Sequence, residues 1–491
     1  MTVRLAQLLV YSLLTLPLAA CTAGPDYVRP QAAIPPAFKE SKGWKQAQPR
    51  DTLLSGKWWE IFNDSRLNGL EEQIAANPSI IQAEARYRQA QHRVQSAQSA
   101  FFPLLNLTGM TNRFRAASGQ SVAVSGVRSL FGAAGAIAWE PDLWGGVRRQ
   151  VEANTGNAQA SAATLQALRL SSQAALADDY FQLEVLDAQK TLLDETAAAY
   201  GKTLEITQNR YQAGIAGKSD VAQAETQLES ARALAINLGV QRAKLEHAIA
   251  VLIGKSPAEL SLSLAPLNAR PPPIPASLPS ELLERRPDIA AAERNIAAAN
   301  AQIGVAKAAY YPSLNLAATN GFQASALDTL FKATSRYWAL GPAGAALTLF
   351  DGGAKNARYR QAIDSFDASV AAYRQTVLTG LQEVEDNLAA LRILEEEKQV
   401  RDKAVASANQ ALALTINQYK AGTVSYLNVM TAQTAALSNR QTAVQLHGES
   451  MSASVLLIKA LGGGWNVAML PNEDQAAGEA KWTDYLIFPV D

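Results

Sequence analysis

Cysteine is almost absent from this chain of 491 residues, which contains only Cys21. An internal disulfide framework and a multi-cysteine metal site are therefore excluded. Histidine is nearly as scarce, and the three histidines and five methionines are scattered, whereas the ligands of a soft metal would be clustered. The sequence also shows no pattern of a nucleophile beside a base. We accordingly expect no enzyme activity, and no metal or other cofactor.

An excess of charge is missing as well, since 44 basic residues balance 44 acidic ones. Binding to nucleic acid needs clustered Lys and Arg in excess, so we expect no nucleic-acid partner. Outside the N-terminus there is no run of 18 or more apolar residues, which excludes a polytopic helical membrane protein. A composition of 48% hydrophobic and 18% charged residues is nevertheless that of an ordered protein.

The N-terminus has the pattern of a bacterial export signal over residues 1–20, with a basic residue before a mostly apolar stretch. Its end, Leu18-Ala19-Ala20-Cys21, resembles the lipobox of bacterial lipoproteins, in which the cysteine carries diacylglycerol after the signal is removed. Several acyl chains make a stable anchor. We therefore predict lipid attachment at Cys21, and Thr22 in place of an aspartate favours sorting to the outer membrane. The alternative is a plain secretory signal with an incidental cysteine.

The body of the chain contains one unit twice. Motifs recur in the same order at offsets of 207 to 209 residues, and the clearest pair is Phe101-Phe102-Pro103 and Tyr310-Tyr311-Pro312. The predicted domains are a lipid-anchored segment (21–64), repeat 1 (65–257), a Pro-rich linker (258–279), repeat 2 (280–465) and a C-terminal segment (466–491). The first segment and the tail from Trp465 to Asp491 hold five of the eight tryptophans, so we expect them to pack together as an equatorial layer.

Each repeat begins with a helix of about 30 residues, such as Ser280 to Ala309, and continues into a β-hairpin, about 104–140 or 313–350. Leucines alternate with Asn106, Thr108 and Asn315, and a period of two residues is typical of a strand. We expect the second strands to end at Trp139 and Phe350. Strands of roughly ten residues that are flanked by aromatic residues fit a bilayer crossing. A soluble hairpin with surface aromatics is the alternative.

A long α-hairpin follows in each repeat, about 146–254 and 353–462, because proline is absent from both stretches. Val377, Leu381, Val384 and Leu388 recur at alternating steps of four and three, the period of a coiled coil. Each first helix is predicted to extend about 100 Å. Each is expected to end at a glycine turn.

Two hairpins give only four strands per chain, and open sheet edges are not tolerated in lipid. Subunits must therefore share one barrel. Two chains would give eight strands, a barrel that side chains fill, whereas three would give twelve strands around a wet lumen. The polar alternating face suits the second arrangement. The sequence thus predicts a mixed α/β membrane protein, a trimeric duct with a shared twelve-stranded β-barrel and a long α-helical coiled-coil barrel.

Further motifs carry a resemblance that covers nearly the whole chain. They are Gly24-Pro25-Asp26-Tyr27, Trp58-Trp59, Leu282-Leu283-Glu284-Arg285-Arg286-Pro287-Asp288-Ile289, Phe350-Asp351-Gly352-Gly353 and Leu461-Gly462-Gly463-Gly464-Trp465. With them the chain resembles the TolC-type outer-membrane efflux ducts, in the lipoprotein branch called NodT or OprM type. The resemblance implies a homotrimer that docks to a periplasmic adaptor protein and an inner-membrane RND pump. It also implies an aperture at the hairpin tips that can close.

Carried over residue by residue, the resemblance implies that the adaptor contacts both tips, at Arg210, Tyr211, Gly214, Tyr419, Lys420 and Gly422. Asn428 and Thr431 occupy positions where many members have carboxylates that ring the aperture. Both are neutral here, which argues against strong cation selectivity at that ring. Asp220 could supply charge instead, although a solvated residue in the first helical turn, beside a possible Ser219 cap, is the simpler interpretation.

Three functions remain compatible with the sequence. The first is a passive exit duct for small toxic compounds in a tripartite RND-type efflux system, in the outer membrane of a Gram-negative bacterium and extending into the periplasm. The second is the exit duct of a protein secretion system. The third is a structural coiled-coil lipoprotein without a pore. The alternating strands favour a duct, and the resemblance favours efflux.

Overall fold

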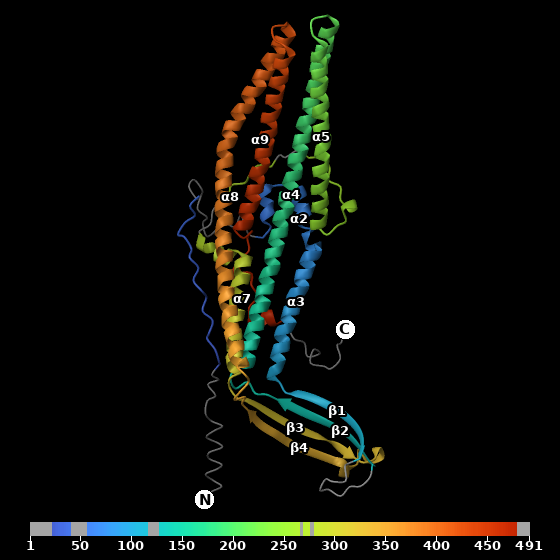
Figure 1. Cartoon of the computed structure of the whole chain (residues 1–491), viewed down its shortest axis with the longest axis vertical. Coiled ribbons are helices and arrows are strands. Elements are labelled where there is room, and N and C mark those ends of the chain that lie inside the picture. Colours follow the sequence, from blue (N-terminus) through green and yellow to red (C-terminus); the bar gives the residue numbers. More distant parts are fainter. Residues whose placement is uncertain (1–21, 41–55, 116–126, 266–268, 275–278, 479–491) are drawn as a thin grey trace.

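The computed structural model describes residues 22–40, 56–115, 127–265, 269–274 and 279–478. The chain is elongated, with a four-stranded sheet at one end and two long α-hairpins that reach the other end (Figure 1). The predicted signal peptide, Cys21, Trp44 and Trp482 lie outside the described residues. No helix in the described ranges is both long and apolar enough to cross a membrane.

The two repeats contain the same elements in the same order, which confirms the predicted fold class of four strands and long helices per chain. The first repeat consists of α3 (Pro78–Gln98), β1 (Leu104–Arg115), β2 (Val127–Trp139), α4 (Gly146–Gln212) and α5 (Lys218–Leu252). The second consists of α7 (Pro287–Ala308), β3 (Ser313–Ala324), β4 (Arg336–Ala346), α8 (Ala354–Ala421) and α9 (Tyr426–Ala460). At 67 and 68 residues, α4 and α8 each extend about 100 Å.

The helix expected from Ser280 to Ala309 is broken, which corrects the sequence-based prediction. A 3₁₀ turn (Pro279–Glu281) and the short α6 (Leu282–Arg285) come first, and α7 then begins at Pro287 and has 22 residues. Proline disfavours helical torsions in the residue before it, and Arg286 is accordingly extended, with φ −99° and ψ 118°.

The strand expected to end at Phe350 ends earlier, at Ala346. Leu349 and Phe350 lie outside the sheet with 90% of their surface exposed. The next residue, Asp351, turns the chain into α8, because its carboxylate accepts hydrogen bonds from the backbone N–H groups of Gly353 (3.0 Å) and Lys355 (2.8 Å). Asp142 caps α4 in the same way, through the N–H groups of residues 147 and 148. Each long helix therefore begins next to an aspartate that accepts backbone N–H groups at its start.

The sheet is antiparallel throughout, in the order β1-β2-β3-β4. Its register aligns residues of like character on each face. One face, which we call the leucine face, has Leu105 level with Ile137, Ala318 and Leu340, and Leu107 level with Trp338 through Gly135 and Asn320. The other face has Asn106 level with Ala136, Thr319 and Ala339. Around Leu105 the sheet therefore has an apolar face, and around Asn106 it has a face of small and polar side chains.

The main hydrophobic core lies at mid-length, where the N-terminal segment packs on the helices. Trp58 and Phe62 of the 3₁₀ helix η2 (Trp58–Phe62) contact each other edge to face, and Phe62 lies 4.9 Å from Phe181 of α4 between ring centroids. Next in the chain is α2 (Ser65–Glu71), which also packs on α4. We call η2 and α2 together the equatorial segment. Trp465 is buried in a separate small cluster with alanines of α4 and α7.

Residues 22–40 form a strap that follows the helices from the sheet end toward the equatorial segment (Figure 1). Near the sheet, Asp26 forms an ion pair with Arg149 (2.7 Å) and the Tyr27 hydroxyl donates to Glu293 (2.5 Å). At the far end, Glu40 forms an ion pair with Arg392 of α8 (2.8 Å). Long-range polar contacts therefore fasten the strap along its length.

Candidate functional site: the two helical tips

The turns that join α4 to α5 and α8 to α9 lie at the end of the molecule opposite the sheet (Figure 1). Each turn has a glycine in the left-handed region, Gly214 with φ 73° and Gly422 with φ 80°. In the first turn the N–H of Ile215 donates to the Arg210 carbonyl (2.9 Å), and in the second the N–H of Thr423 donates to the Gln418 carbonyl (3.0 Å). Glycine suits such helix ends, because it has no Cβ to clash when φ is positive.

Arg210 connects the two tips. Its Nη1 donates to the carbonyl oxygens of Tyr419 (2.9 Å) and Lys420 (3.4 Å), which lie in the last turn of α8. Its guanidinium carbon also lies 4.7 Å from the centre of the Tyr419 ring, within the range of a cation–π contact. One arginine therefore holds the end of α8 to the end of α4 by charge-assisted hydrogen bonds and by ring contact.

A layer of buried aromatic and hydroxyl groups lies beneath this contact. Tyr419 is 3% exposed, its hydroxyl is 3.2 Å from Thr207 Oγ1 on α4, and its ring meets that of Tyr426 edge to face at 5.9 Å. One helical turn further from the tip, Gln433 Nε2 donates to Thr203 Oγ1 (3.2 Å). Burial, helped by the nearby Tyr200, Tyr419 and Asp220, raises the pKa of Tyr426 to about 12, so its phenol stays neutral at any physiological pH.

The structure separates the predicted site residues into two groups. Arg210 and Tyr419 form the contact between the tips, whereas Tyr211, Gly214, Lys420 and Gly422 are exposed around it. Exposed surface at the first tip includes Tyr211 (44%) and the neighbouring Ile215 (65%). The turns thus present apolar and basic groups to solvent.

The aperture candidates do not meet one another within one chain. Asn428 and Thr431 are exposed in the first turns of α9, where Asn428 Oδ1 accepts from the Ser425 hydroxyl and the Thr431 hydroxyl donates to its own helix. Asp220 is half-buried in the first turn of α5. Ser219 is not the N-cap of α5, because that position is occupied by Gly217, which has no side chain to accept a hydrogen bond.

Sequence reasoning missed Thr203, Thr207, Tyr426 and Gln433. Thr203 and Thr207 are spaced i, i+4 and share a buried face of α4, so polar residues at core spacing were the available signal. Their partners lie more than 200 residues away, which the sequence pattern does not reveal.

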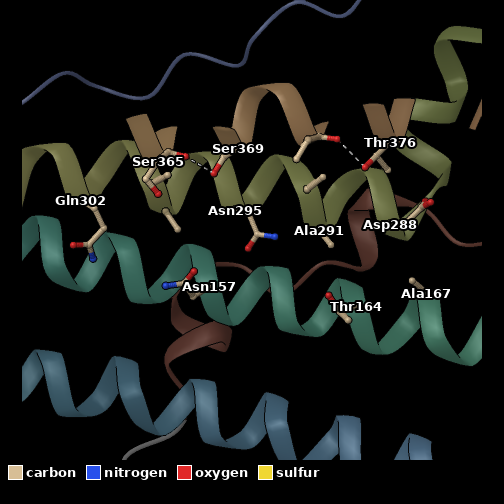
Figure 2. A pocket seen from close by; sticks show the side chains of 14 residues that line it. Asn157, Thr164, Ala167, Asp288, Ala291, Asn295, Gln302, Ser365, Ser369 and Thr376 are labelled. Carbon is tan, nitrogen blue, oxygen red and sulfur yellow. Dashed lines mark hydrogen bonds between the residues drawn. The ribbon is translucent and has the colours of Figure 1, made fainter. Parts of the chain in front are cut away.

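A shallow cavity of about 680 Å³ lies elsewhere, between α4, α7 and α8 in the half nearer the sheet. Small and polar side chains line it, among them Asn157, Asn295 and Gln302 (Figure 2). The hydroxyls of Ser369 and Thr376 donate to carbonyls of their own helix one turn earlier. The lining gives a wettable surface without groups that converge on one ligand.

The described chain begins at the junction of strands and helices. The N–H of Ala23 donates to the Trp144 carbonyl (2.9 Å), and Trp144 stacks on Tyr311 with ring centroids 4.8 Å apart. Thr22 packs so closely on Gly145 that an added Cβ there would lie 2.7 Å from its Cγ2. The residue next to Cys21 is therefore fixed beside the aromatic residues at the base of the strands.

Comparison with protein families gives a match in both repeats. The family described as outer membrane efflux protein matches residues 69–255 and 278–463. The two matches coincide with the two copies of the structural unit.

Individual relatives match over nearly their whole length. The toluene efflux pump outer membrane protein TtgC of Pseudomonas putida is 31% identical over 456 residues, 91% of this chain and 93% of the relative. The outer membrane protein OprJ of Pseudomonas aeruginosa is 31% identical over 464 residues, 92% of this chain and 95% of the relative.

Solved structures share the fold. The outer-membrane channel OprN superposes with a TM-score of 0.84 at 29% identity, over 91% of this chain and 100% of that chain. The open state of the MtrE outer membrane channel of Neisseria gonorrhoeae superposes with a TM-score of 0.80 at 28% identity, over 91% of this chain and 99% of that chain.

Proposed function

The chain belongs to the outer membrane efflux protein family, and from this we propose that it is the passive exit duct of a tripartite RND-type efflux system. It is an outer membrane channel of a Gram-negative bacterium and not an enzyme. The observation that carries the proposal is the pairing of a four-stranded sheet, apolar on one face, with α-hairpins about 100 Å long.

The working unit is a homotrimer. Four strands leave two open edges, and unpaired backbone groups in hydrocarbon cost several kcal/mol each. Three chains supply the twelve strands of a barrel with a water-filled lumen, whereas the eight strands of a dimer would be filled by side chains. The leucine face would then contact lipid, and the face with Asn106 would line the lumen.

The cargo consists of small toxic compounds that an inner-membrane RND pump delivers through a periplasmic adaptor. Relatives named for efflux of toluene and of antibiotics support this class of cargo. The adaptor contacts the exposed residues of the tips, Tyr211, Gly214, Lys420 and Gly422, together with Arg210 and Tyr419. The exposed tyrosine and the bound arginine support this assignment, because such residues are enriched at protein interfaces.

The aperture lies at the same end and is held narrow by the contact between Arg210 and Tyr419. In the trimer, Asn428, Thr431 and Asp220 would face the opening. Two of these three side chains are neutral, so the aperture would select cations only weakly.

We expect Arg210→Ala to increase the single-channel conductance of the purified trimer in planar bilayers. Loss of a charge-assisted hydrogen bond removes about 2 kcal/mol from the closed arrangement, which shifts the ratio of open to closed tips roughly 30-fold. Arg232→Ala is the matched control, because Arg232 pairs only with the exposed Glu229 on α5 among the described contacts. A trimer that does not conduct even with Arg210→Ala would indicate a scaffold without a pore.

Lipid attachment at Cys21 would anchor the trimer in the periplasmic leaflet, at the level where Trp144 and Tyr311 stack. We expect the wild-type chain expressed in a Gram-negative host to incorporate labelled palmitate, and Cys21→Ala to incorporate none. Thr22→Ala is the control and should keep the label. A wild-type chain without label, cleaved at another position by intact mass, would identify a plain secretory signal instead.

A further inference from the structure

Glu71, the last residue of α2, is a buried carboxyl group without a partner. Its side chain belongs to a residue only 1% exposed, and within the described ranges neither carboxyl oxygen has a hydrogen-bond partner. An ionised carboxylate in such a place costs several kcal/mol, so the group avoids ionisation by keeping its proton. Burial accordingly raises the pKa of Glu71 to about 9.

A second buried carboxyl group, Glu184 of α4, is linked to the equatorial segment by the phenol of Tyr180. The Tyr180 hydroxyl oxygen is 2.8 Å from Glu184 Oε1 and 2.9 Å from Asp64 Oδ2. Asp64 is the N-cap of α2, and Glu184 is 4% exposed. One phenol has one hydrogen, so it can donate to only one of these two acids.

The direction of the hydrogen bonds follows from the cap. Asp64 Oδ1 accepts the backbone N–H groups of Arg66 (2.8 Å) and Leu67 (3.0 Å), so this carboxyl group acts as an acceptor at the cap. Tyr180 can donate to Asp64 and keep its contact with Glu184 only if Glu184 bears a proton and donates it to the phenol oxygen. Burial is the main cause that raises the pKa of Glu184 to about 7, and the negative charges of Asp64 and Asp187 add to it.

The charged groups near Glu71 and Glu184 are bound to other partners. Neither acid therefore forms an ion pair in the described part of the chain. Arg66, whose charge lowers the pKa of Glu184, donates to Ser263. Arg242 of α5 is bound to Asp187 (2.7 Å) and to Glu246 (2.9 Å). On the equatorial segment side, Lys57 pairs with Glu72 and Glu60 is exposed. On α4, the pKa of Asp179 is raised to about 6 by burial and by Asp178.

We propose that Glu71 and Glu184 are proton-binding groups that hold the equatorial segment on α4, so that this docking is tight at acidic pH and loosens as the pH rises. Both acids bind protons more strongly when docked than when exposed to solvent. As the pH rises above 4.5, the ordinary pKa of a glutamate, the docked state therefore loses stability. The loss that Glu184 causes is complete near pH 7, and the loss that Glu71 causes is complete near pH 9.

Hydrogen exchange tests the proposal on the full-length trimer in detergent. The measured quantity is the local opening of residues 64–74 at pH 5.5 and pH 8.0, after correction for the intrinsic pH dependence of exchange. We expect the equilibrium constant for opening of the wild type to increase at least about tenfold between these two pH values. Where opening releases one proton, each pH unit raises this constant by up to a factor of ten.

Glu71→Gln with Glu184→Gln is expected to remove this pH dependence, because glutamine keeps the neutral shape and supplies an N–H to Tyr180. The matched control Glu60→Gln, an exposed residue of the same segment, should keep the wild-type dependence. If the double variant does not assemble, each single variant should show a reduced pH dependence. A wild type whose opening is independent of pH, or acid variants that keep the full dependence, would overturn the proposal.

Discussion

Replacing Leu107 by arginine is expected to abolish assembly of the trimer in the outer membrane. Leu107 is the fourth residue of β1, lies on the leucine face and is 87% exposed in the single chain. An arginine on the lipid-facing side of a strand costs up to about 2–4 kcal/mol, the largest values applying at the bilayer midplane. A symmetric trimer incurs that cost three times, which is comparable to the whole stability of an ordinary domain. The amount of heat-resistant trimer in outer-membrane fractions measures the effect.

Thr108→Arg is the matched control, because Thr108 is the next residue of the same strand and belongs to the polar face. We expect its trimers to assemble in near wild-type amounts, since a lumen-facing arginine stays in water. The same contrast is expected between Leu314 and Asn315 on β3. Equal tolerance on both faces would show that the strands do not cross lipid with the leucine face outward.

Replacing Arg286 by alanine is expected to destabilise the helical half of the chain by about 3 kcal/mol. Arg286 is 6% exposed and joins three elements at the point where α7 begins. It donates to both oxygens of Asp288 (3.1 and 2.7 Å), to Glu383 on α8 (2.6 Å) and to the Ala460 carbonyl at the end of α9 (3.1 Å). Its loss removes this donor from Glu383 and from the Ala460 carbonyl, and leaves Asp288 with the N–H of Ile289 (3.0 Å). Both carboxylates are 38% exposed, so solvation keeps the cost near the lower end for a buried pair.

The first repeat supplies an internal comparison. Asn77 precedes Pro78 as Arg286 precedes Pro287, and its Nδ2 donates to the Leu252 carbonyl at the end of α5 (2.9 Å). Asn77→Ala removes a neutral hydrogen bond and an N-cap, so we expect a smaller loss, about 1 kcal/mol. Thermal unfolding midpoints of the two variants, measured at one scan rate, show which variant loses more stability. An Arg286 variant no less stable than the Asn77 variant would contradict the role assigned to the buried charge.

The sequence alone determined the repeated architecture of this protein. Proline-free stretches with heptad spacing predicted the long helices, alternation of leucine with asparagine predicted β1 and β3, and positive-φ glycines at 214 and 422 are where the tips were expected. These signals are local, because backbone preference and side-chain periodicity are properties of neighbouring residues. The break at Pro287 is equally local, since the residue before a proline avoids helical torsions.

Only the tertiary structure decided how the elements are joined. Arg210 meets the Tyr419 carbonyl 209 residues away, and Asp64 meets Tyr180 116 residues away. Such pairs depend on which helix faces approach one another, which no local pattern encodes. The end of β4 at Ala346 was decided in the same way, by where its pairing with β3 ends. Local chemistry fixed the elements of the duct, and long-range packing fixed the contact at its tips and the buried acids at its centre.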